Sequence, residues 1–139
     1  MSDALPGARP RKIERILLVD DEQDIRTIAS MSLRRVGGWA VVAVASGPEG
    51  LAEARRAPPD LILIDVMMPG CDGPTTLRML RDDPATAAIP ILFLTARSRR
   101  VEIDELLALG AEGVIVKPFD PMLLPDQIRR ILQGDPGPA

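Results

Sequence analysis

The sequence predicts an α/β protein: a doubly wound, parallel, five-stranded sheet of the (βα)5 type with helices on both faces. Short apolar runs alternate five times with segments whose apolar residues recur every three or four positions. Some runs, such as residues 61–64, are apolar at every position, which is typical of strands buried on both faces. The chain has 139 residues, the size of one domain.

Each expected unit is a short strand followed by a helix. The expected strands are residues 16–19, 40–45, 61–64, 90–94 and 114–116. The expected helices are residues 25–36, 46–56, 75–81, 99–109 and a last one between residues 120 and 132.

Turn residues set the ends of the first two helices. Gly37-Gly38 ends the first, because glycine readily adopts the left-handed conformation that closes a helix. The segment 46–48, Ser-Gly-Pro, opens the second and places proline in its first turn, where a missing N–H costs nothing.

The later helices carry similar signals. The segment 72–74, Asp-Gly-Pro, forms a turn before the third helix, and Gly110 closes the fourth. Pro125 would lack the N–H that closes the first turn if the last helix began at Pro121. That helix therefore starts nearer Leu124, or its first turn is irregular.

The chain ends differ in composition from the middle. Residues 1–12 are rich in Pro, Gly and Ala and are expected to form a disordered leader; residues 133–139 are expected to form a flexible tail, with the domain at 13–132. No apolar run approaches the roughly 20 residues of a membrane helix, and residues 1–11 lack a signal core. We therefore expect a cytoplasmic protein with no membrane contact.

Several chemistries are excluded by residues that the sequence lacks. It contains no histidine, which excludes Ser-His-Asp and Cys-His catalysis and ordinary zinc sites. A single cysteine, Cys71, excludes an internal disulfide. Without tyrosine, with three other aromatic residues and a net charge of −3, the chain suits nucleic acid poorly, and we expect no nucleic-acid partner.

Polar residues stand at the ends of four of the five expected strands: Asp20 and Asp21, Asp65, Thr95 and Lys117. In a parallel sheet such ends line the crevice where sites form. If the first and third strands are neighbours, three carboxylates meet, which raises a pKa or requires a cation. With oxygen ligands alone, that cation is Mg²⁺. The lysine and the hydroxyl suggest phosphoryl chemistry, in which a carboxylate beside Mg²⁺ forms an aspartyl phosphate.

Four segments together resemble the receiver domain of bacterial two-component response regulators. They are residues 16–22, residues 61–70 with Asp72-Gly73, residues 94–96 and residues 116–119. Each segment alone is weak evidence, but four in this order, each at a strand end, are specific. The resemblance covers about residues 15–132 and implies the flavodoxin-like strand order 2-1-3-4-5.

The resemblance implies a role for each site residue. Asp65 is the phospho-acceptor, and Asp20 and Asp21 hold Mg²⁺ with the backbone carbonyl of Met67 as a further ligand. Two further residues act on the phosphoryl group: Thr95 contacts it and moves, and Lys117 pairs first with Asp65 and then with the phosphoryl oxygens. The Lys117–Pro118 bond is expected to be cis.

The resemblance also implies a donor of the phosphoryl group: a phosphohistidine on a sensor histidine kinase or a histidine phosphotransfer protein.

Two positions bear on regulation. Val114 stands where the family usually has an aromatic residue, so activation is read by shifts around residues 95–109 and 114–116, or coupling is weak. Met67, two residues after the acceptor, suits no hydrolytic water, which favours a long-lived phosphoryl state.

Three functions are compared. The first is a single-domain receiver that switches binding of an unidentified protein target or relays phosphate, as a monomer or weak dimer, and is no enzyme beyond its own phosphorylation and dephosphorylation on Asp65. The second is a receiver-like scaffold that ignores phosphorylation. The third, ranked last, is an aspartyl phosphatase.

A cluster of three arginines lies near the expected site: Arg97, Arg99 and Arg100. We interpret it first as a solvated helix start and second as a contact for a partner or phosphate.

Overall fold

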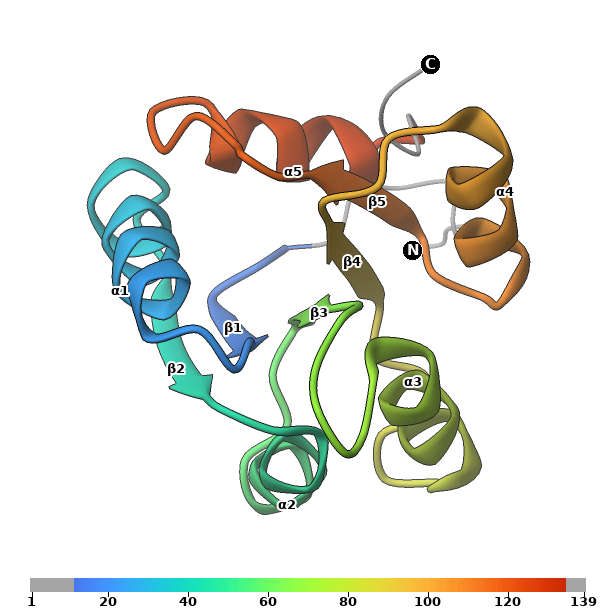
Figure 1. Cartoon of the computed structure of the whole chain (residues 1–139). Coiled ribbons are helices and arrows are strands. Elements are labelled where there is room, and N and C mark those ends of the chain that lie inside the picture. The colour runs from blue at the N-terminus through green and yellow to red at the C-terminus, as the bar shows by residue number, and fades with distance from the viewer. Residues whose placement is uncertain (1–11, 135–139) are drawn as a thin grey trace, which may run out of the picture.

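A computed structural model describes residues 12–134, in which five parallel strands form one sheet in the order β2-β1-β3-β4-β5 (Figure 1). The strands are β1 (Arg15–Val19), β2 (Ala40–Val44), β3 (Leu61–Asp65), β4 (Ile91–Thr95) and β5 (Gly113–Val116). The helices are α1 (Gln23–Met31), the π-helical segment η1 (Ser32–Val36), α2 (Gly47–Arg56), α3 (Gly73–Asp82), α4 (Arg100–Ala108) and α5 (Leu124–Leu132). The expected fold class and strand order are confirmed.

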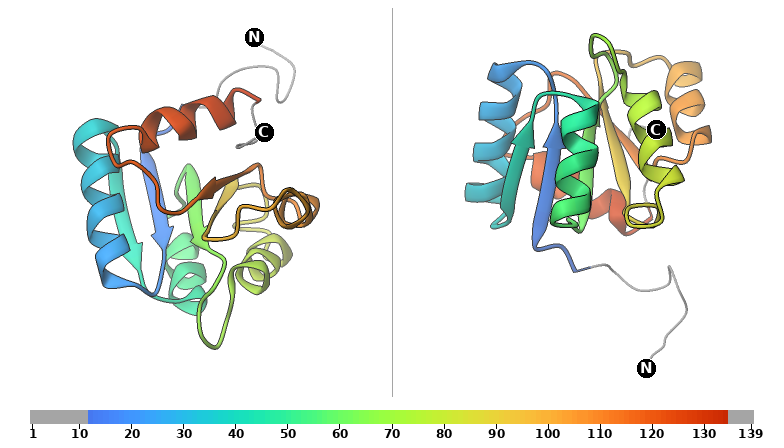
Figure 2. Two further views of the ribbon diagram at one scale, coloured as in Figure 1. Left: turned by 45° about the horizontal axis from the view of Figure 1, so that its top comes forward. Right: turned by 90° about the horizontal axis from the view of Figure 1, so that it is seen from below.

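Helices cover both faces of the sheet (Figures 1 and 2). They enclose two apolar cores, one on each face. Successive residues of a strand point to opposite faces. Ile16 and Leu18 of β1 therefore pack with α1 and α5, whereas Leu17 and Val19 pack with α2, α3 and α4. The central strands β3 and β4 are buried at every position. This double coverage explains why their sequences are apolar throughout.

The strand register aligns the carboxyl ends of the strands. β1 lies between β2 and β3, and Val19 stands opposite Ile64, one residue before Asp65. Thr95 stands opposite Val116, one residue before Lys117. Polar residues that are far apart in the chain therefore meet at one edge of the sheet.

Capping residues fix where the helices begin. The Ser46 hydroxyl accepts a hydrogen bond from the Glu49 N–H at the start of α2. The Asp72 carboxylate accepts one from the Thr75 N–H, so α3 begins at Gly73, before the expected Thr75. α5 begins at Leu124 with proline in its first turn, which confirms the expected start near Leu124.

The first helix departs from the expected pattern in its last turn. The sequence predicted a regular helix to Val36, but the helix widens into η1 from Ser32 onward. The Gly37 N–H donates to the Ser32 carbonyl five residues earlier, and the buried Ser32 hydroxyl donates to the Pro121 carbonyl. The spacing of apolar residues does not reveal such a bulge. The bulge is accompanied by a contact with the loop before α5, which is far away in the sequence.

The expected leader and tail lie outside the described residues, except for Lys12, Gln133 and Gly134. Within residues 12–134, no helix combines the length and the apolar character needed to cross a lipid bilayer.

Candidate functional site

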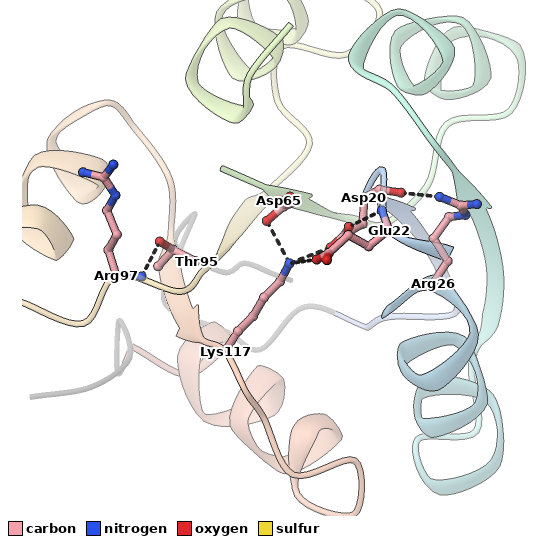
Figure 3. A network of polar contacts seen from close by, with 7 residues as sticks. All are labelled: Asp20, Glu22, Arg26, Asp65, Thr95, Arg97 and Lys117. Carbon is pink, nitrogen blue, oxygen red and sulfur yellow. Dashed lines mark hydrogen bonds and ion pairs between the residues drawn. The ribbon is translucent and has the colours of Figure 1, made fainter. Parts of the chain in front are cut away.

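Four of the expected site residues lie close together at the carboxyl edge of the sheet (Figure 3). Asp20 directly follows β1, Asp65 ends β3, Thr95 ends β4 and Lys117 directly follows β5. Asp20 and Thr95 are fully buried, and Asp65 is 4% exposed. The edge therefore holds charged groups that have largely lost their contact with water.

Asp20 is held by hydrogen bonds at every polar atom. Its Oδ1 accepts from the Glu22 N–H at 2.9 Å, and its Oδ2 accepts from the Lys117 ammonium at 3.0 Å. Its backbone N–H donates to the Val44 carbonyl at 3.1 Å, and its own carbonyl accepts from the Arg26 guanidinium at 2.7 Å. Asp20 is therefore fixed in place without any ligand.

Lys117 joins three carboxylates. Its Nζ lies 2.9 Å from Asp65 Oδ1, 3.0 Å from Asp20 Oδ2 and 3.5 Å from Glu22 Oε1. Burial alone would lower the pKa of Lys117, but the hydrogen bonds to Asp65 and Asp20 outweigh burial and raise it. The side chain therefore stays a cation between the acids. The Lys117–Pro118 bond is cis, as the resemblance implied.

Burial raises the pKa of Asp65 to about 6. The hydrogen bond from Lys117 opposes this shift, while repulsion from Asp20 and Asp21 adds to it. Burial and the neighbouring carboxylates together thus outweigh the ammonium of Lys117. A second cation near Asp65 would stabilise its ionised form, which is the form a nucleophile needs.

Oxygen atoms of Asp20, Asp21 and Asp65 lie within 4.8 Å of one another. Asp21 supplies the atom that most clearly lacks a partner: its Oδ1 is buried and has no hydrogen-bond partner in the described part of the chain. A buried, unpaired carboxylate oxygen is costly, and a hard divalent cation satisfies it. The three side chains therefore fit Mg²⁺. The part of the Met67 carbonyl stays a prediction.

Thr95 lies on the other flank of Lys117 (Figure 3). Its hydroxyl accepts a hydrogen bond from the Arg97 N–H at 3.0 Å, and its carbonyl accepts one from the Lys117 N–H at 2.7 Å. The Arg97 side chain points away from the acids and pairs with Glu102 at 3.3 Å.

The other arginines of this segment are exposed. Arg99 precedes α4 with no side-chain cap, and Arg100 pairs with Asp104 one turn along the helix. These contacts favour the first interpretation of the cluster, a solvated helix start.

Val114 is fully buried in the core beneath α4, with Phe93 and Ile103 in the same cluster. An aliphatic side chain thus fills the place that the family usually gives to an aromatic ring. No ring is available there to swing between two positions.

Two residues of the network were missed by the sequence interpretation: Glu22 and Arg26. Both lie at the start of α1, and their spacing of four residues puts them on one side of the helix. That spacing, directly after Asp20-Asp21, was the available signal. A charged residue in a first helical turn is so common that it did not stand out.

The fold and this arrangement of acids and lysine define the class of protein. The family model for the response regulator receiver domain matches residues 16–129. The chain belongs to this family of two-component signalling proteins.

Particular relatives support the assignment. The transcriptional regulatory proteins CseB and AfsQ1 of Streptomyces coelicolor are 36% and 40% identical to it over 118 residues, which is 85% of this chain and 49% and 51% of theirs. The chain thus spans about half the length of these curated relatives. The solved structure of the chemotaxis response regulator CheY4 of Vibrio cholerae has a TM-score of 0.79 and 35% identity, covering 86% of this chain and 99% of that one.

Proposed function

We propose that this receiver domain accepts a phosphoryl group on Asp65, in a reaction that depends on Mg²⁺, from a phosphohistidine on a sensor histidine kinase or histidine phosphotransfer protein. One observation carries the proposal: Asp65 lies 2.9 Å from the Lys117 ammonium and within 4.8 Å of the oxygen atoms of Asp20 and Asp21. This arrangement combines a nucleophile, a cation and a metal-binding set in one buried place.

The transfer exchanges one bond to phosphorus for another. An oxygen of the Asp65 carboxylate attacks the phosphorus atom, the bond from phosphorus to the imidazole nitrogen breaks, and its electron pair stays on the imidazole, which takes up a proton. Asp20, Asp21 and Asp65 would hold Mg²⁺, which when bound would supply positive charge near the phosphoryl oxygens. Lys117 then pairs with one of those oxygens, and the Thr95 hydroxyl donates to another after it releases the Arg97 N–H.

The experiment is labelling with a small phosphodonor. The protein is incubated with acetyl phosphate and Mg²⁺, and its intact mass is measured. Wild type gains one phosphoryl mass and Asp65→Asn gains none. Asp72→Asn is the matched control, because Asp72 is a carboxylate of the same loop that caps α3 instead, and this variant is labelled like wild type. An unlabelled wild type, or a labelled Asp65→Asn, contradicts the proposal.

The same site would switch binding of a protein target or pass the phosphoryl group on, without nucleic acid. These roles, and action as a single domain, stay predictions, because the chain spans only about half the length of CseB and AfsQ1. A pull-down with phosphorylated and unphosphorylated protein tests the switch.

The buried Val114 favours a second candidate, a receiver-like scaffold whose binding ignores phosphorylation. Its test compares wild type, Asp65→Asn and Asp65→Glu for affinity to a captured partner. Equal affinities favour the scaffold, and a difference of tenfold or so favours the switch.

A further inference from the structure

Resting on the proposed function, we infer that Arg26 is a positioning residue for the metal-binding aspartates: its guanidinium fixes the turn that carries Asp20 and Asp21. Arg26 lies in the first turn of α1 and reaches back to the Asp20 carbonyl at 2.7 Å (Figure 3). A guanidinium–carbonyl bond of this length is charge-assisted and short. It ties a rigid helix to the turn after β1.

The turn needs such an anchor because its two aspartates have different tasks. Asp20 is fully buried and already bonded through both carboxylate oxygens. Asp21 is partly exposed, and its buried Oδ1 has no hydrogen-bond partner among residues 12–134. The backbone between them decides whether that oxygen faces Asp65. Arg26 bonds the carbonyl of the very peptide that links Asp20 to Asp21, so it fixes the orientation of this peptide.

If Arg26 acted only through its charge, its removal would change the affinity for Mg²⁺ in the opposite direction. A cation beside a Mg²⁺ site repels the metal, so removing its charge alone would strengthen Mg²⁺ binding. Removing an anchor weakens binding, because the ligands must then be ordered when the metal arrives. The direction of the change in affinity therefore separates the two roles.

Calorimetric titration with Mg²⁺, without phosphodonor, makes the comparison. Arg26→Ala is expected to weaken Mg²⁺ binding about tenfold, and Arg26→Lys, which keeps a cationic donor at this position, to recover part of the loss. Arg97→Ala is the matched control, since Arg97 also lies near the site but pairs with Glu102, and its affinity stays within about twofold of wild type. Unchanged or tighter binding by Arg26→Ala overturns the inference.

Amide hydrogen exchange in metal-free protein gives a second readout. The Glu22 N–H donates to Asp20 Oδ1, so its exchange reports on the turn, and we expect it to rise about fivefold or more in Arg26→Ala. The Thr75 N–H makes the equivalent bond to Asp72 Oδ1 and stays unchanged. Equal exchange of the Glu22 N–H in both proteins overturns the inference even if wild type binds no Mg²⁺. If wild type binds no Mg²⁺, or if Asp65 is not labelled, the result counts against the proposed function instead.

Discussion

The two flanks of the site are held in contrasting ways. On the carboxylate flank (Asp20, Asp21, Asp65 and Lys117), two buried acids share one ammonium within 3.0 Å. On the threonine flank (Thr95 and the segment to the start of α4), Thr95 has one side-chain hydrogen bond, to the N–H of Arg97. The helix that follows starts without a side-chain cap.

Charge at the helix starts strengthens the contrast. The N-terminus of a helix carries partial positive charge, which disfavours the arginines at the start of α4. α3, by contrast, starts with Asp72, whose pKa is lowered by hydrogen bonds from Thr75. The carboxylate flank is thus held by hydrogen bonds from Lys117, whereas the threonine flank, with fewer side-chain contacts, is the part that a phosphoryl group can rearrange at low cost. Four changes test this contrast.

Replacing Lys117 should have the largest effect. Lys117→Met leaves Asp20 and Asp65 buried without their cation, and we expect it to lower the free energy of unfolding at neutral pH by about 3 kcal/mol. Urea unfolding in metal-free buffer measures the change. Lys12→Met is the control, because Lys12 is exposed and its contact with Glu14 lies at the surface. A loss below about 1 kcal/mol would show that the carboxylate flank is not held by this ammonium.

Asp65 should make stability depend on pH. Since burial raises its pKa from 3.8 to about 6, the folded chain holds this proton more tightly than the unfolded chain. The contribution of Asp65 to the free energy of unfolding therefore falls as the pH rises from 3.8 to about 6, by up to about 3 kcal/mol. Asp65→Asn removes this loss, while Lys117 keeps Asp20 as a partner.

Urea unfolding without metal, at about pH 4 and about pH 7, compares the two proteins. The Asn variant should be the more stable at the higher pH, and the difference should shrink at the lower pH. A variant less stable than wild type at the higher pH would contradict the raised pKa.

On the threonine flank the effects should be smaller. Thr95→Val keeps the shape of the buried side chain but leaves the Arg97 N–H without its acceptor, which should cost about 1 kcal/mol. Thr95→Ser keeps the hydroxyl and should cost less. A loss as large as that of Lys117→Met would abolish the contrast between the flanks.

The smallest effect is expected at the start of α4. Arg99→Ser offers a capping hydroxyl and removes a charge from the helix N-terminus, so stability should rise by about 0.5 kcal/mol. Thermal unfolding measures it. Asp72→Ala at the start of α3 is the mirror experiment and should lower stability by about 1 kcal/mol. A decrease in stability on Arg99→Ser would show that the Arg99 side chain makes a stabilising contact at this helix start.

Much of this could be predicted because the relevant signals are local. Apolar runs in the sequence predicted the five strands, and the strand ends pointed to Asp20, Asp65, Thr95 and Lys117 as site residues. The bulge at η1 and the bond from Arg26 could not be predicted in the same way. Ser32 meets Pro121, 89 residues away in the chain, and Arg26 meets a backbone carbonyl, which every residue has.

By itself, the sequence determined the alternation of strands and helices, the absence of histidine and disulfide chemistry, and which acids, hydroxyl and lysine stand at strand ends. Only the tertiary structure decided how these groups share their charges. Lys117 lies between Asp20 and Asp65, Asp21 Oδ1 has no partner in the described part of the chain, and the pKa of Asp65 is raised to about 6. The physical reason is range. Side-chain periodicity is set by neighbours along the chain, whereas burial and charge pairing depend on which segments the sheet register brings together.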